Sequence, residues 1–127
     1  MRVIVFAKAT KDTEAGVVPT KQAWEEMDQF NEELIKAGVL IAGEGLKPSS
    51  EGVRIRYSGK DRFVTDGPFP EIKEVIAGYS IWEVASMEVA VDWAKRCPMT
   101  EPWEVEIRPA FCYSEDEVND IMSQSEE

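Results

Sequence analysis

The feature that most constrains this chain is an excess of two-sided apolar strands over the helices that could cover them. Residues 3–6 read Val-Ile-Val-Phe without polar alternation, and residues 75–84 form the most apolar segment of the chain. Such runs predict strands that are buried on both faces. Long helices with one apolar stripe are predicted only at 20–37 and 86–97. Two helices cover one face of a sheet, so we expect a second copy to cover the other.

The order of the remaining elements predicts the fold class. Further strands are expected at 39–46, 53–57, 62–65 and 103–108, separated by turn-forming segments. The resulting order β-α-β-β-(β)-β-α-β predicts an α+β fold: a ferredoxin-like antiparallel sheet with two helices on one face. We expect the uncovered face to expose Val3, Val5, Tyr79 and Ile81 or their neighbours. Two such sheets stacked face to face would form a dimeric α/β barrel with an inter-sheet pocket.

The chain divides into a ferredoxin-like domain at 1–113 and an acidic tail at 114–127. The tail holds six acidic residues and no basic one. Ser114 and Glu117 form a capping box in front of Val118, Ile121 and Met122, which have helical spacing. We therefore predict a short amphipathic helix, marginal on its own, that docks on the body or on a partner.

Length and charge limit the classes of partner. The 127 residues suit one domain, and 14 basic against 25 acidic residues give a net charge of −11. A phosphate backbone would be repelled at long range, so no nucleic acid partner is expected. The basic cluster at Arg54, Arg56, Lys60 and Arg62 is expected to be a solvated hairpin face rather than a phosphate site. No apolar run reaches the roughly 20 residues of a membrane span, so we expect a cytoplasmic protein without a membrane partner.

The lack of histidine and the two cysteines limit the chemistry. Without histidine, Ser-His-Asp and Cys-His catalysis and histidine-ligated metals are excluded. No cysteine spacing indicates zinc, and we expect neither a metal nor a cofactor. Cys97 and Cys112 are expected to be reduced, buried thiols, with a disulfide between them as the alternative.

The densest group of chemistry-bearing residues runs from Asp66 to Glu74. One interpretation is a rigid turn followed by a solvated charge cluster. The other places its carboxylates at the mouth of the inter-sheet pocket, where Lys73 would tune a carboxylate's pKa or bind an anion. In the second interpretation Asp66 or Glu71 would act as a base in an isomerisation or elimination, unless both prove fully solvated. The candidate ligand-binding residues are Phe6, Lys73, Glu74, Tyr79, Trp82 and Arg108. Tyr79 and Trp82 point to opposite faces of their strand, so one of them is expected in the pocket and the other under a helix.

Asp66-Gly67-Pro68-Phe69, followed by Glu71, Lys73-Glu74 and Gly78-Tyr79, resembles the DGPF branch of the YCII-related family. The segments 37–40, 43–48, 86–98 and 104–109 also resemble this family, so the resemblance covers about residues 1–110. It implies a dimeric α+β barrel of ferredoxin-like subunits, but no activity. Members are mostly uncharacterised, some are encoded beside or fused to alternative sigma factors, and others are suspected enzymes. The His/Asp pair of the YCII branch cannot be carried over whole, although Asp66 falls at the DGPF aspartate.

Two functions from different classes follow as hypotheses. The first is a dimer that binds a small molecule between its sheets, as a binding protein or as a carboxylate-based isomerase or lyase. The alternative is a non-catalytic regulatory or protein-interaction module that presents the acidic tail or the hairpin around Tyr57 to a protein partner. The family resemblance adds a link to a sigma factor to this alternative.

Overall fold

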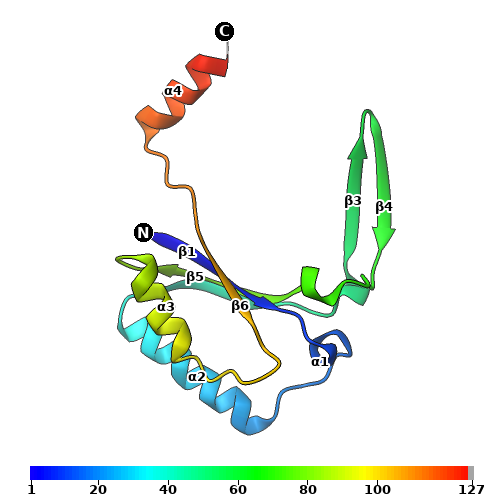
Figure 1. The fold of residues 1–127 in the computed structure, drawn as a ribbon, viewed down its shortest axis with the longest axis vertical. Coiled ribbons are helices and arrows are strands. Elements are labelled where there is room, and N and C mark those ends of the chain that lie inside the picture. Colours follow the sequence, from blue (N-terminus) through cyan, green and yellow to red (C-terminus); the bar gives the residue numbers. More distant parts are fainter. Residues whose placement is uncertain (126–127) are drawn as a thin grey trace.

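The computed structural model describes residues 1–125. It contains a four-stranded sheet, a separate two-stranded hairpin and helices that lie against or beside them (Figure 1). In chain order the elements are β1 (Arg2–Lys8), α1 (Lys11–Glu14), α2 (Lys21–Lys36), β2 (Leu40–Gly45), η1 (Ser49–Glu51), β3 (Val53–Ser58), β4 (Asp61–Asp66), η2 (Ile72–Glu74), β5 (Ile76–Glu83), α3 (Met87–Lys95), β6 (Val105–Pro109) and α4 (Glu115–Ser125), where η marks a 3-10 helix.

The main sheet has the strand order β2-β5-β1-β6, and its neighbouring strands are all antiparallel. With α2 and α3 as the crossover helices, this is the ferredoxin-like α+β arrangement predicted from the sequence. Val3 lies opposite Trp82 and Phe6 lies opposite Tyr79 in the central pair of strands. Because directly opposite residues share a face, these pairs mark the two sides of the sheet.

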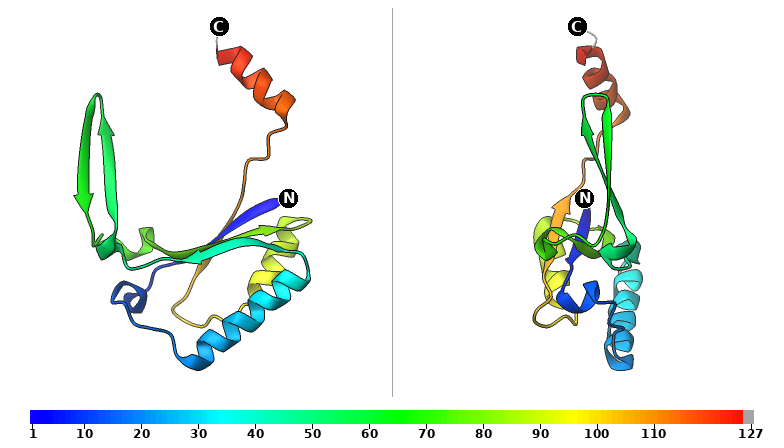
Figure 2. Two further views of the ribbon diagram at one scale, coloured as in Figure 1. Left: turned by 180° about the vertical axis from the view of Figure 1, so that it is seen from behind. Right: turned by 90° about the vertical axis from the view of Figure 1, so that its right-hand side faces the viewer.

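Both long helices cover the same face of the sheet (Figures 1 and 2). The side chain of Thr20 accepts a hydrogen bond from the Ala23 amide at 3.1 Å, and Ser86 does the same for Val89 at 3.2 Å. These caps satisfy amides that the first turn of each helix leaves unpaired. Gly38 follows α2 with a φ of +72°, a left-handed conformation that glycine adopts without a steric penalty and that lets β2 begin two residues later.

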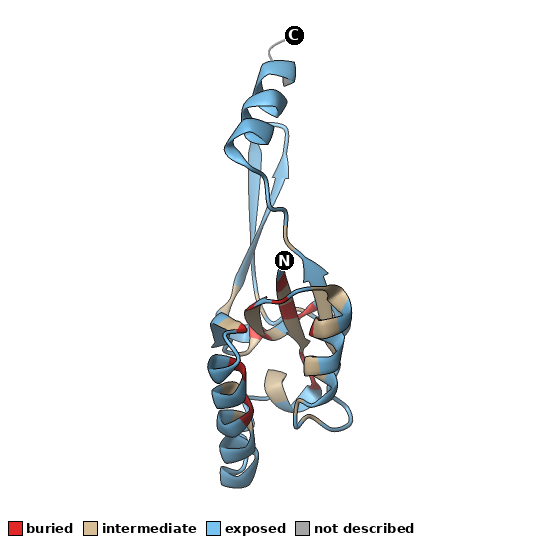
Figure 3. Ribbon diagram, turned by 90° about the vertical axis from the view of Figure 1, so that its left-hand side faces the viewer, coloured by how far each residue is buried: buried red, intermediate tan, exposed pale blue. Residues whose placement is uncertain are grey.

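The hydrophobic core lies between the helices and the sheet, where the buried residues gather in Figure 3. Val3 and Val5 face the helices, so of the two predicted possibilities for the uncovered side of β1, these residues or their neighbours, the second holds. Their neighbours Ile4 and Phe6 occupy the open face instead, with Tyr79 and Ile81 opposite them on β5. The core cluster consists of Val3, Val5, Phe30, Leu34, Val39, Trp82, Val84 and Ala90.

Two segments leave this body on the side away from the helices. The β3–β4 hairpin rises at one end of the sheet, and α4 stands beyond the other end after an extended linker (Figures 1 and 2). The predicted hairpin is confirmed, but it pairs only within itself and does not extend the main sheet. The predicted tail helix is also present, with the Glu117 amide donating to Ser114 Oγ at 3.1 Å. Among the described residues, 1–125, this helix stands apart from the body.

Three local features differ from the sequence predictions or complete them. The segment 10–19 contains a short helix, α1, which Thr10 and Thr13 cap reciprocally. Cys97 is partly buried while Cys112 is exposed, so the prediction of two buried thiols is wrong for Cys112; neither forms a disulfide. Within residues 1–125, the helices are all too short or too polar to cross a bilayer.

Candidate functional site

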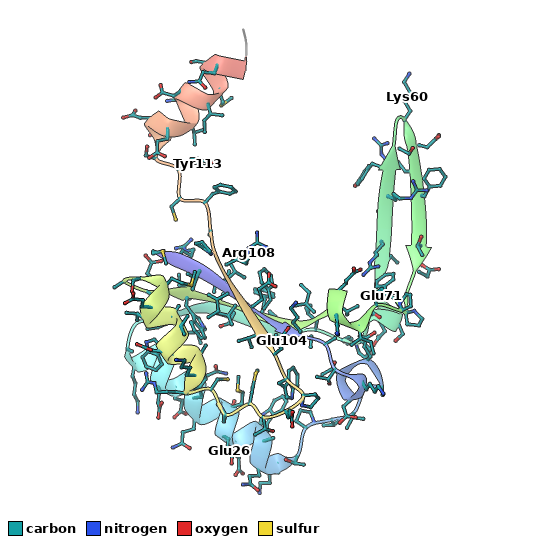
Figure 4. The ribbon with its side chains drawn as sticks, in the orientation of Figure 1. Glu26, Lys60, Glu71, Glu104, Arg108 and Tyr113 are labelled. Carbon is teal, nitrogen blue, oxygen red and sulfur yellow. The ribbon has the colours of Figure 1, made fainter. Side chains whose placement is uncertain are left out.

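The open face carries a hollow of about 300 Å³ where β1, β6 and the segment around η2 meet. Arg108 and Glu71 mark its surroundings in Figure 4, with Arg108 on the β6 side. The lining residues are Phe6, Lys8, Lys73, Glu74, Val75, Ile76, Glu106 and Arg108.

Two walls of the hollow come from the neighbouring strands β1 and β6. Phe6 lies opposite Glu106, and Ile4 lies opposite Arg108, in the antiparallel β1–β6 pair. Side chains at every second position point to the same face, so Lys8 follows Phe6 and Arg108 follows Glu106. The third wall comes from residues 73–76, which the Ala9 amide holds through a 2.9 Å hydrogen bond to the Val75 carbonyl.

The hollow contains three cations and two carboxylates, in a chain whose net charge is −11. Glu106 lies between two of the cations, with Lys8 Nζ at 3.4 Å from Oε1 and Arg108 Nη1 at 3.5 Å from Oε2. Lys8 Nζ also lies 3.7 Å from a carboxylate oxygen of Glu104. These pairs are partly exposed, so their contribution to stability is small and their side chains are able to exchange partners.

The structure brings four of the residues predicted to bind a ligand into this hollow: Phe6, Lys73, Glu74 and Arg108. Tyr79 lies next to them, opposite Phe6 on the open face. Trp82 lies on the opposite face, 3% exposed in the helix-side core, where its Nε1 donates to Ser80 Oγ at 2.8 Å. Because the hollow is on the other side of the sheet, Trp82 cannot line it.

The two residues predicted to act as bases lie elsewhere. Asp66 ends β4 at the base of the hairpin, and Glu71 precedes η2. Both are exposed and neither lines the hollow. A single chain therefore gives no support to proton transfer by Asp66 or Glu71.

Four lining residues were not among those predicted to bind a ligand: Val75, Ile76, Glu106 and Lys8. Lys8 is the one cation among these four. It sits two positions after Phe6 in the first strand, so strand alternation would have placed it on the same face.

The segment 66–69 has a structural role that the geometry makes clear. The buried Ser49 accepts a 3.1 Å hydrogen bond from the Phe69 amide, and Ser49 in turn donates to the Glu14 carboxylate from its amide, at 3.0 Å, and from its hydroxyl. Gly67 packs so closely on Ser49 that an added Cβ would lie 1.7 Å from the Ser49 carbonyl oxygen. This junction joins α1, η1 and the base of the hairpin.

The amino-acid sequence of this chain matches those of known proteins. The profile of the YCII-related domain matches residues 1–114. The chain belongs to the YCII-related family. An uncharacterized protein of Rhizobium meliloti (strain 1021), R00369, is 28% identical over 95 residues, which cover 73% of this chain and 77% of that protein. The predicted family is thereby confirmed, whereas the narrower assignment to the DGPF branch stays a prediction that rests on residues 66–69.

Proposed function

We propose that this YCII-related chain pairs with a second copy through the open face of its sheet and binds a small carboxylate-bearing molecule in the hollow that the pairing encloses. The observation that carries the proposal is a continuous surface in which partly buried apolar side chains adjoin the three cations of the hollow. The apolar part consists of Ile4, Phe6, Tyr79 and Ile81.

The pairing follows from the composition of the open face. Its centre is apolar, while its edges carry charged pairs such as Arg2 with Glu83, at 3.7 Å. An apolar centre with a polar rim is the usual anatomy of a protein–protein interface. A two-fold axis in the interface would bring the same patch from both copies into contact, which suits a patch centred on one central strand pair.

The lining of the hollow favours one class of ligand. A planar guanidinium such as that of Arg108 binds a carboxylate through two parallel hydrogen bonds. Lys73 would supply a second positive charge, while Phe6, Val75 and Ile76 offer apolar contact for the rest of the molecule. A volume of about 300 Å³ is at the lower end of ligand pockets, so the ligand would be small.

Binding, rather than catalysis, is the function that the geometry supports. The carboxylates within reach of the hollow are Glu74 and Glu106, and Glu106 is already engaged by Lys8 and Arg108. The isomerase or lyase chemistry predicted for Asp66 and Glu71 is therefore not part of this proposal.

Sedimentation equilibrium at micromolar protein concentration tests the pairing. The wild-type chain should be a dimer, and Ile81→Lys should shift it to a folded monomer because a charge would be buried at the centre of the interface. Ile35→Lys, on the outer side of α2 and 60% exposed, is the matched control and should remain dimeric. A monomeric wild-type chain would contradict the proposal.

Thermal-shift measurements with benzoate and benzamide test the ligand class. These probes have the same ring and differ in charge, so benzoate should raise the melting temperature and benzamide should not. Arg108→Gln should abolish the benzoate effect, whereas Arg96→Gln, on the far side of the body at the end of α3, should keep it. Equal shifts with both probes, or a benzoate shift that survives Arg108→Gln, would refute the carboxylate site.

A further inference from the structure

We infer that, in this dimer, the β3–β4 hairpin of one copy packs against α4 of the other, so that each subunit clasps its partner at both ends. The inference rests on the proposed open-face dimer and adds to it a second contact, made by segments that leave the body of the chain.

The hairpin has one largely apolar face that no other helix or strand of residues 1–125 covers. The register places Ile55 opposite Val64 and Tyr57 opposite Arg62, and Val53 shares their face. These apolar side chains are between 49% and 68% exposed. An isolated two-stranded hairpin is marginally stable in water, so packing of this apolar face against another apolar surface would stabilise it.

Helix α4 has a matching stripe. Val118, Ile121 and Met122 lie on one side at helical spacing, and all three side chains are exposed. At 3.6 residues per turn, Glu115 and Glu117 flank the stripe on its two sides. A helix of 11 residues is also marginal by itself, so both segments gain stability if each covers the other.

Charge favours this pairing over the two symmetrical ones. Residues 53–66 contain four basic and two acidic residues, while residues 115–125 contain four acidic and no basic residues. If the two hairpins packed against each other, Arg62 and its basic neighbours would face the same residues of the second copy. If the two α4 helices packed against each other, carboxylates would face carboxylates. Both pairings would bring like charges together. Hairpin against α4 places opposite charges beside a shared apolar stripe.

The arrangement of the two segments suits such a contact. Both stand on the open side of the sheet, at opposite ends, with Lys60 at the hairpin tip and Tyr113 in the linker to α4 (Figure 4). If the second copy is related by a two-fold axis perpendicular to the view of Figure 1, its α4 falls at the end where the first copy's hairpin rises. Six-residue strands span about 20 Å and the 11-residue helix about 16 Å, so the lengths match.

A charge swap tests the electrostatic part of the contact. Arg62→Glu and Glu117→Lys should each weaken dimerisation about tenfold, because every change occurs twice in a symmetric dimer. The double variant should restore the wild-type constant to within about twofold. Lys36→Glu, at the end of α2, is the control and should have no effect. If the double variant is as weak as the sum of the two single variants, the clasp is refuted.

Disulfide trapping tests the geometry without depending on charge. In a Cys112→Ser background, the chain carrying both Val64→Cys and Ile121→Cys should form a covalent dimer on mild oxidation, and each single variant should not. Covalent dimers of Val64→Cys alone or Ile121→Cys alone would show hairpin–hairpin or tail–tail contact and overturn the inference. A fast-migrating monomer from the double variant would show that the tail folds onto its own hairpin, with the same consequence.

Sedimentation of the wild-type chain separates the two proposals. A dimer that yields no hairpin–tail cross-link would overturn the clasp and leave the open-face dimer standing. A monomer at micromolar concentration would overturn both.

Discussion

The helix-covered body and the two projecting segments use the same kinds of sequence pattern but differ in what covers them. In the body, Leu34 is 1% exposed under the sheet, whereas Tyr57 in the hairpin is 68% exposed. Helical spacing is as regular in α4 as in α2, and β3 alternates apolar and polar residues whereas residues 3–6 of β1 are apolar throughout. An amphipathic pattern therefore specifies a helix or strand and its apolar side, but not the surface against which that side packs.

The largest expected effect separates the two regions by stability. Leu34→Ala should lower the free energy of unfolding by about 3 kcal/mol, because it opens a cavity in the core. Tyr57→Ala should lower it by less than about 0.5 kcal/mol in the monomeric Ile81→Lys background, where the hairpin has no partner to cover it. Urea unfolding followed by far-UV circular dichroism measures both. An equal loss would mean that the hairpin belongs to the cooperative core, and the comparison would fail.

A substitution at the junction between the body and the hairpin should lower the stability of the fold. Gly67→Ala should cost about 2 kcal/mol, because the new Cβ would overlap the Ser49 carbonyl and force the backbone to move. Gly45→Ala is the matched control, since nothing lies within 4 Å of a Cβ added there. The same urea titration compares them. Indistinguishable midpoints would show that the junction is looser than its contacts indicate.

Removal of the Glu14 carboxylate from this junction should lower the free energy of unfolding somewhat less than Gly67→Ala does. Glu14→Ala should cost about 1.5 kcal/mol, because it leaves the buried amide and hydroxyl of Ser49 without their acceptor. Asp12→Ala removes an exposed carboxylate from the same short helix and should cost little. Hydrogen exchange of the hairpin amides adds a second measurement: exchange should speed up in Glu14→Ala alone if the junction holds the hairpin in place.

The smallest expected effect concerns the two thiols. Burial raises the pKa of the Cys97 thiol above its ordinary value of 9.0, while Cys112 is exposed in the linker to α4. An aromatic disulfide reagent at mildly alkaline pH should therefore react first with Cys112, and Cys112→Ser should remove the fast phase. Two equal phases in the wild-type chain would contradict the burial of Cys97.

The raised pKa also sets the sign of a small pH dependence. Above about pH 9 the unfolded chain loses the Cys97 proton before the folded chain does, so the stability present at neutral pH should decline as the pH rises through the folded pKa. Cys97→Ala should remove this part of the alkaline decline.

The sequence predicted the fold well where local signals were strong. Thr20, Ser86 and the glycine after the first long helix placed both long helices, and the apolar runs placed β1 and β5. It failed on which side of β1 is covered, since a Val-Ile-Val-Phe run is apolar on both sides and contains no information about where the helices lie. The sequence therefore left open whether Val3 and Val5 or their neighbours face the open side.

The candidate site was predicted in part. Phe6, Lys73, Glu74 and Arg108 were expected at one pocket, and they do line one hollow. Asp66 and Glu71 were expected beside them because they are close in sequence. Only the segment from Lys73 onward lines the hollow, and the preceding residues back to the hairpin base lie outside it. Tyr79 and Trp82 were expected on opposite faces of their strand, one of them at the pocket, but strand alternation by itself does not say which one.

Local chemistry in the chain determined the helices, the strands, the hairpin turn, the tail helix and the exclusion of histidine-based catalysis, because each depends on residues a few positions apart. Only the tertiary structure decided that both helices meet one face, that Lys8 and Arg108 share a hollow, and that the hairpin and α4 stand free on the other side. Those outcomes depend on strand register and on the direction in which each segment leaves the sheet, which contacts between distant residues fix.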